Sequence, residues 1–152
     1  MKGHETMKKT IWFDMDGTLA SLYDVKDWLP KLEAQDASPY VEARPMHNMS
    51  RLARYLNKAR KLGYKIGIIS WLSKVSTPTY DADVTEAKKQ WLNKHLTSVS
   101  WDELNIVSYG TPKSNFITGT DDILFDDELK NRTEWHGVAY EPNQIFEVLQ
   151  AL

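Results

Sequence analysis

The chain has 152 residues, of which 41% are hydrophobic and 26% charged, with a formal net charge of -2 and no cysteine. This composition is typical of a soluble globular domain, and the longest apolar runs are too short to cross a membrane. It provides no long basic block for coating nucleic acid, no disulfide and no thiolate metal ligand. We therefore expect a single domain over residues 1–152, located in the cytoplasm.

The N-terminal segment MKGHETMKKT is polar and predicts no secretory signal. We expect residues 1–6 to be disordered or to derive from a cloning vector, with Met7 as an alternative start. Residues 8–14 (KKTIWFD) then predict a first strand, because they are rich in β-branched and aromatic side chains.

Two helices and a second strand are predicted in the middle of the chain. Apolar residues recur at helical spacing over 50–62, and Gly63 ends that helix. The aliphatic run 64–70 (YKIGIIS) predicts a buried strand. Asp83 and Glu86 have the spacing of a capping box at the start of a second helix. The apolar faces of the two helices are Leu52, Tyr55, Leu56, Ala59 and Leu62, and Val84, Ala87, Trp91, Leu92 and Leu96.

Three short strands and a terminal helix follow. The strands are predicted over 104–109 (LNIVSY), 122–127 (DILFDD) and 137–141 (GVAYE), and the helix over 143–152 after Pro142. Strands that alternate with helices predict an α/β fold, with a Rossmann-like, mostly parallel sheet of about five strands covered by helices on both faces.

Polar side chains follow several of these strands at the point where each strand ends. Asp14 ends the first strand, Ser70 the second, and Asp126 and Asp127 the fourth, while Lys113 lies in the loop after the third. In open α/β sheets, ligands bind beyond the carboxyl ends of the strands. We therefore expect these side chains to meet at one edge of the sheet.

These four segments resemble the four motifs of the haloacid dehalogenase (HAD) superfamily of phosphohydrolases, in the same order and over nearly the whole chain. The first motif is similar to Asp14-Met15-Asp16-Gly17-Thr18, the second to Ser70, the third to Lys113 and the fourth to Asp126-Asp127.

The resemblance implies a HAD-like fold and a phosphatase that works through an aspartyl-phosphate. It implies that Asp14 is the nucleophile, and that Asp16 protonates the leaving alcohol and then deprotonates the hydrolytic water. The phosphate-binding residues it implies are Gly17, Thr18, Ser70, Trp71 and Lys113. The metal ligands it implies are Asp14, the backbone carbonyl of Asp16, Asp126 and Asp127. Which of Asp126 and Asp127 binds the metal directly is left open.

Electrostatics also calls for a cation here. A carboxylate that attacks a dianionic phosphate monoester at about 4 Å is repelled by roughly 4 kcal/mol per unit-charge pair at an effective dielectric constant near 20. Carboxylate oxygens suit Mg²⁺, whereas the four histidines are scattered without the spacing of a zinc site. We therefore expect Mg²⁺ as the cofactor.

A narrower resemblance is to the 5'(3')-deoxyribonucleotidase branch of the superfamily. It is carried by the stretches ARP (43–45), EAKKQWL (86–92), KSNFI (113–117) and DDILFDDELKN (121–131). The chain departs from that branch at Trp71 and Leu72, where a small residue and a proline are usual.

Residues 20–49 are all that remains between the first strand and the first crossover helix, so they predict a small lid instead of a complete cap domain. Five aromatic residues lie in segments near the expected site: Tyr23, Trp28, Tyr40, Trp71 and Tyr80. Such side chains could stack a nucleobase, although Trp28 fits better as a packing residue.

The favoured hypothesis is a Mg²⁺-dependent phosphatase acting on (deoxy)nucleoside monophosphates. Two alternatives stay open. One is a phosphatase for a polynucleotide 3'-phosphate or a phosphoprotein, which a small lid would admit, although the modest charge argues against the polynucleotide. The other is a non-catalytic phosphate-binding protein. The sequence predicts no membrane partner and leaves the oligomeric state open.

Overall fold

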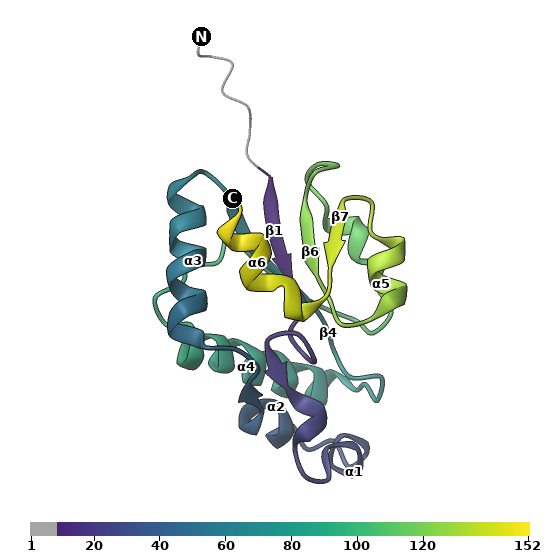
Figure 1. Cartoon of the computed structure of the whole chain (residues 1–152). Coiled ribbons are helices and arrows are strands. Elements are labelled where there is room, and N and C mark those ends of the chain that lie inside the picture. The colour runs from purple at the N-terminus through teal and green to yellow at the C-terminus, as the bar shows by residue number, and fades with distance from the viewer. Residues whose placement is uncertain (1–8) are drawn as a thin grey trace.

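A five-stranded parallel sheet organises residues 9–152, the part of the chain that the computed structural model describes (Figure 1). Its strands are β1 (Thr10–Phe13), β4 (Lys65–Trp71), β5 (Glu103–Val107), β6 (Ile123–Phe125) and β7 (Val138–Tyr140). They pair in the order β5-β4-β1-β6-β7, and every neighbouring pair is parallel. The expected Rossmann-like sheet is therefore confirmed. The expectations for residues 1–6 and Met7 fall outside the described residues.

Six α-helices and three short 3-10 helices accompany this sheet within residues 9–152. The α-helices are α1 (Trp28–Glu33), α2 (Ser38–Glu42), α3 (Met49–Lys61), α4 (Pro78–His95), α5 (Leu129–Glu134) and α6 (Ile145–Gln150). The 3-10 helices are η2 (Leu22–Asp24), η3 (Lys113–Phe116) and η4 (Pro142–Gln144). None of the helices in this part of the chain is long and apolar enough to cross a membrane.

The alternation of side chains along β1 separates two apolar clusters. Ile11 and Phe13 lie in the larger cluster, with residues of α3, α6 and the C-terminal half of α4. Trp12 points to the other face, where it lies in a cluster with Trp135 and with Phe116 of η3. Both faces of the central strand are thus buried, as the apolar run in its sequence indicates.

Helix α4 begins earlier than predicted. Thr77 is its N-cap and accepts a hydrogen bond from the backbone N–H of Tyr80, and Pro78 occupies the first turn. The predicted capping box of Asp83 and Glu86 is wrong, because a threonine cap followed by proline starts the helix five residues upstream of Asp83.

Helix α3 agrees with its predicted range to within one residue, with Asn48 as its N-cap. Leu52, Leu56 and Ala59 are buried as predicted, but Leu62 is 42% exposed. Leu62 is the C-cap residue, beyond the last helical turn, so the helical periodicity that placed it on the apolar face no longer applies there.

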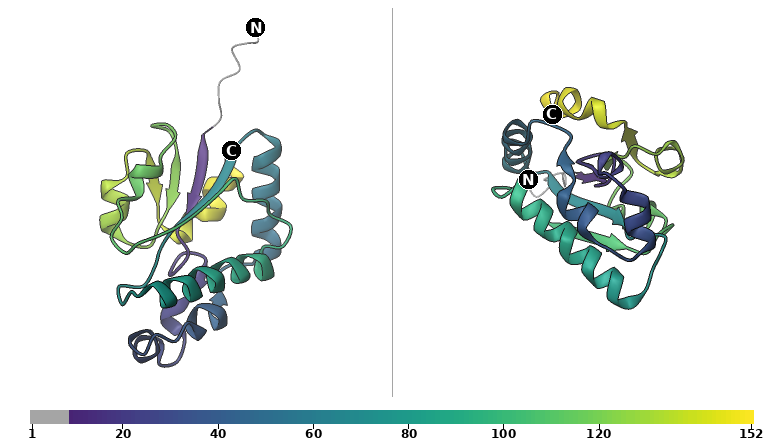
Figure 2. Two further views of the ribbon diagram at one scale, coloured as in Figure 1. Left: turned by 180° about the vertical axis from the view of Figure 1, so that it is seen from behind. Right: turned by 90° about the horizontal axis from the view of Figure 1, so that it is seen from below.

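Residues 20–49 form a small substructure at the carboxyl ends of the strands. It contains η2, α1, α2 and the two-stranded antiparallel pair β2 (Ala20–Ser21) and β3 (Arg44–Pro45). It lies below the sheet in Figure 1, and the view from below in Figure 2 shows it beside α4. A separate apolar cluster joins it to α4, through Leu22, Leu32 and Tyr40 on one side and Tyr80, Val84 and Ala87 on the other.

Candidate active site

The loop after β1 turns back tightly and carries the first two aspartates. Gly17 adopts φ +82°, a conformation that side-chain-bearing residues rarely adopt, and its N–H donates to the carbonyl of Ala20. Met15 is buried in the larger core cluster. The hydroxyl of Thr18 donates a 3.1 Å hydrogen bond to Oδ2 of Asp14, so this threonine holds the carboxylate to which the resemblance assigns the role of nucleophile.

Lys113 joins the first motif to the last. Its Nζ atom lies 2.9 Å from Oδ1 of Asp14 and 2.6 Å from Oδ2 of Asp126, and its side chain is buried. Burial alone would lower the pKa of Lys113, but the neighbouring carboxylates of Asp14 and Asp126 raise it above its usual value. The ammonium is therefore held in its charged form between two carboxylates. These two acids are more than a hundred residues apart in the chain.

Three carboxylates gather at the end of β1 and β6. Oxygen atoms of Asp14, Asp126 and Asp127 all lie within 4.8 Å of one another. Burial, together with the charge of Asp14, raises the pKa of Asp126 to about 6 and that of Asp127 to about 8. One ammonium therefore does not compensate three clustered carboxylates. Their close-set hard oxygen atoms fit a divalent cation such as Mg²⁺, which would relieve the repulsion.

Asp126 is also the most constrained of the three. Its Oδ1 accepts the backbone N–H of Glu128 at 2.9 Å, and its Oδ2 accepts from Asn131 at 3.2 Å as well as from Lys113. It has no exposed surface, whereas Asp127 is half-buried and lines the pocket described below.

Ser70 reaches the same region from β4, but it has a partner that the sequence analysis missed. Lys88 of α4 places its Nζ atom 2.5 Å from Oγ of Ser70 and 2.9 Å from Oδ2 of Asp16. Burial raises the pKa of Asp16, and the charge of Lys88 opposes that rise. Lys88 lies four residues after Val84 and three before Trp91, on the buried face of the helix, which is an unusual place for a lysine and the signal that could have revealed it.

A pocket of about 370 Å³ opens next to these residues. Its wall includes Asp14, Asp16, Lys113 and Asp127 together with a largely apolar surface. Four of the five aromatic residues expected near the site line it: Tyr23, Trp28, Tyr40 and Trp71. Tyr80 does not, because it is buried between α4 and residues 20–49, where its hydroxyl donates to the carbonyl of Asp36.

The aromatic side chains form two pairs on the pocket wall. In residues 20–49, the rings of Tyr23 and Trp28 meet edge to face at 5.0 Å. At the carboxyl ends of β4 and β5, the rings of Trp71 and Tyr109 also lie 5.0 Å apart. Sequence analysis missed Tyr109, although it is the last residue of the third predicted strand, at the same edge of the sheet. Trp71 is fixed by its indole N–H, which donates to the carbonyl of Thr111 at 2.8 Å.

Comparison with solved structures finds proteins of similar fold, of which two are described. One is D,D-heptose 1,7-bisphosphate phosphatase from Burkholderia thailandensis, with a TM-score of 0.51 and 14% identity over 83% of this chain and 70% of that one. The other is a chain of the Pnkp1/Rnl/Hen1 complex, with a TM-score of 0.55 and 18% identity over 90% of this chain. This chain spans 47% of that second protein's length.

Comparisons with protein-family models and with curated proteins gave no match. At these low identities the structural similarity concerns the fold alone. The Rossmann-like α/β fold expected from the sequence is therefore confirmed: a five-stranded parallel sheet with its acidic cluster at the carboxyl ends of the strands.

Proposed function

We propose that this protein is a Mg²⁺-dependent phosphatase of the HAD superfamily that hydrolyses phosphomonoesters through an aspartyl-phosphate. The observation that carries this proposal is the contact of one buried ammonium, Lys113, with both Asp14 and Asp126 beside an open pocket. The D,D-heptose 1,7-bisphosphate phosphatase of similar fold is, by its name, also a phosphatase.

The reaction would begin with an in-line attack by a carboxylate oxygen of Asp14 on phosphorus, while Thr18 and Lys113 hold that carboxylate. The ester P–O bond breaks, and the leaving oxygen takes a proton from Asp16. Water then attacks the phosphoryl group, Asp16 accepts its proton, and Asp14 is released with inorganic phosphate. The carboxylates of Asp14, Asp126 and Asp127 and the carbonyl of Asp16 would hold Mg²⁺. The ion would neutralise charge on the phosphoryl oxygens.

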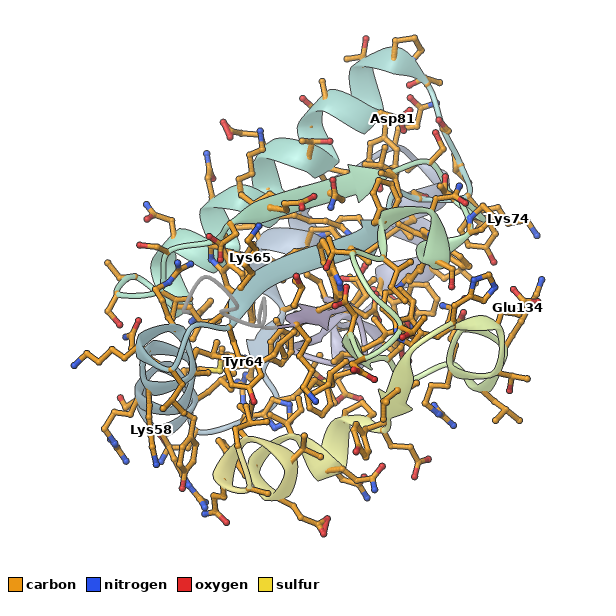
Figure 3. The ribbon with its side chains drawn as sticks, turned by 90° about the horizontal axis from the view of Figure 1, so that it is seen from above. Lys58, Tyr64, Lys65, Lys74, Asp81 and Glu134 are labelled. Atoms are coloured by element: carbon orange, nitrogen blue, oxygen red, sulfur yellow. The ribbon has the colours of Figure 1, made fainter. Side chains whose placement is uncertain are left out.

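The pocket favours a substrate with one phosphate and a flat, mainly uncharged leaving group. Among the described residues, its wall has two cationic side chains, Lys74 and Lys113, and the carboxylates Asp14, Asp16, Glu33, Asp127 and Glu128. Lys113 is already held by its two acids, and Figure 3 shows Lys74 at the outer edge of the molecule. A flat base could instead stack on one of the aromatic pairs, Tyr23–Trp28 or Trp71–Tyr109. We therefore propose a nucleoside monophosphate as the substrate, as in the 5'(3')-deoxyribonucleotidase branch.

The same charges weigh against the alternatives. A polynucleotide end or a sugar bisphosphate brings further phosphates, which would have to lie near Glu33, Asp127 and Glu128. A protein that only binds phosphate would not need the proton-transferring carboxylate of Asp16 beside Asp14.

A substrate panel tests the proposal. Phosphate release would be measured with and without Mg²⁺ on nucleoside 5'- and 3'-monophosphates, a sugar bisphosphate, a 3'-phosphorylated oligonucleotide and a phosphopeptide. We expect Mg²⁺-dependent release, fastest from a mononucleotide, and none from the Asp14→Asn variant. Fastest release from the oligonucleotide or phosphopeptide would overturn the substrate class, and no release from any member would overturn the enzymatic function.

A further inference from the structure

Lys88 is a fully buried cation to which the resemblance to the HAD motifs assigns no role. It lies on α4 between Val84 and Trp91, in a helix face that is otherwise apolar. A buried ammonium is costly unless it is paired and fully hydrogen-bonded, so its position calls for an explanation in the site that it contacts.

The three donors of this ammonium all have acceptors. Its Nζ atom lies 2.9 Å from Oδ2 of Asp16, 2.5 Å from Oγ of Ser70 and 2.8 Å from the backbone carbonyl of Trp71. A lysine ammonium has three N–H groups, so none is left for a substrate. Lys88 therefore acts on its neighbours and does not bind the phosphate itself.

These contacts determine how the two neighbouring side chains are presented. Because Lys88 can only donate, Oγ of Ser70 must accept from it, and the hydroxyl proton of Ser70 is left to donate elsewhere. Oδ2 of Asp16 is likewise held by the ammonium, so the other oxygen, Oδ1, remains to carry a proton. Asp16 also lines the pocket, where a leaving group would lie.

Lys88 also connects these side chains to residues 20–49. Its Nζ atom lies 5.2 Å from the ring centre of Tyr40, within range of a cation–π contact. Ala87, its neighbour in the chain, packs in the cluster that joins α4 to Leu22, Leu32 and Tyr40. The ammonium is thus contacted from three sides: by Asp16, by β4 and by α2.

We propose that Lys88 is a positioning residue that holds Asp16 in the orientation needed to protonate the leaving group. This proposal rests on the proposed phosphatase function. In this proposal a residue of α4 determines the orientation of the Asp16 side chain, although this helix carries none of the four motif segments.

The test compares two leaving groups. An alkyl alkoxide needs the proton from Asp16, whereas p-nitrophenolate leaves readily without it. We would measure kcat/KM for the best alkyl monoester of the panel and for p-nitrophenyl phosphate, because kcat/KM does not depend on the later hydrolysis of the aspartyl-phosphate. The alkyl-to-nitrophenyl ratio is the first value divided by the second. For Lys88→Met we expect both values to fall, because Ser70 loses the ammonium that holds it. We expect the value for the alkyl ester to fall roughly 10- to 100-fold further.

Lys89→Met is the matched control, since Lys89 is the exposed neighbour on the same helix and should leave both values unchanged. If Lys88→Met does not fold, the double variant Asp16→Asn/Lys88→Met removes both charges together and is compared with Asp16→Asn alone. The alkyl-to-nitrophenyl ratio should then be the same in both, because Lys88 has no carboxylate left to orient.

Equal losses on the two esters in Lys88→Met, or a further drop of the ratio in the double variant, would overturn the proposed role of Lys88 and leave the phosphatase function intact. A wild-type protein that releases no phosphate from either ester would overturn both.

Discussion

Gly17 lies so close to Asp127 that a Cβ atom added to the glycine would be 2.2 Å from Oδ2 of the aspartate. The first and last motifs therefore meet through a backbone that has no room for a side chain. The positive φ of Gly17 adds a second reason for glycine at this position.

Replacing Gly17 by alanine should push the Asp127 carboxylate away from Asp14 and weaken the proposed metal site. We expect the Mg²⁺ concentration for half-maximal activity to rise roughly 10-fold or more. The control is Gly110→Ala, because Gly110 has φ +86° and nothing within 4 Å of an added Cβ, so it shares the backbone strain without the clash. An equal Mg²⁺ requirement in the two variants would show that Asp127 does not act on the metal.

The sheet and its acidic edge were predictable because they depend on local signals. Apolar runs marked the strands, and the carboxyl ends of parallel strands must lie along one edge, so Asp14 and Asp126 were expected to meet although 112 positions separate them in the sequence. The start of α4 was misplaced because Asp83 and Glu86 had capping spacing, whereas the Thr77-Pro78 pair controls the first turn.

Lys88 and Tyr109 were missed for a different reason. Their roles depend on contacts between elements that are distant in the sequence: Lys88 pairs with Asp16 across 72 positions. The helical periodicity of the apolar residues could show that position 88 faces the core, but not which carboxylate contacts it there. Tyr80 shows the converse error, because proximity in sequence to the site did not reveal that its ring packs away from the pocket.

Another buried carboxylate, that of Asp122, should stabilise the fold without serving the site. It has no exposed surface, and it accepts hydrogen bonds from the backbone N–H of Thr10, the indole N–H of Trp12, and both the N–H and hydroxyl of Thr118. Asp122→Ala would leave these donors unsatisfied, so we expect the free energy of unfolding to fall by about 3 kcal/mol or more.

Urea denaturation would measure this loss, with Asp121→Asn as the control because Asp121 is the exposed neighbour. A change in Asp122→Ala no larger than that in the control would mean that the network contributes nothing to stability.

Mg²⁺ should stabilise the protein more at pH 8 than at pH 5. The pKa of Asp127 is raised to about 8 and that of Asp126 to about 6, so without metal the folded state holds protons that the unfolded state has lost. These two groups therefore make the metal-free protein less stable as pH rises from about 4 to 8. Mg²⁺ needs the deprotonated carboxylates, so its effect grows over the same range.

The measurement is the shift in Tm on adding Mg²⁺ at the two pH values. Comparing shifts at fixed pH removes the contribution of the other titrating groups. The Asp127→Asn variant should show a smaller shift at pH 8, since it lacks one ligand. A shift of the same size at both pH values would contradict metal binding by these carboxylates.

Trp71 should discriminate between substrates by their leaving group. Its ring lies 5.0 Å from Tyr109 on the pocket wall and 5.4 Å from Nζ of Lys113, so a base bound beside it would be next to the phosphate site. Stacking of a base on an aromatic ring is worth roughly 1 to 3 kcal/mol, so Trp71→Ala should raise KM for a mononucleotide roughly 10-fold or more. Glycerol phosphate has no ring to stack, so its KM should change much less.

Leu104→Ala, which alters an exposed side chain of β5 that does not line the pocket, should change neither value. Equal increases in KM for both esters in Trp71→Ala would mean that the tryptophan supports the phosphate site and not a base, and would remove the main structural argument for a nucleotide substrate.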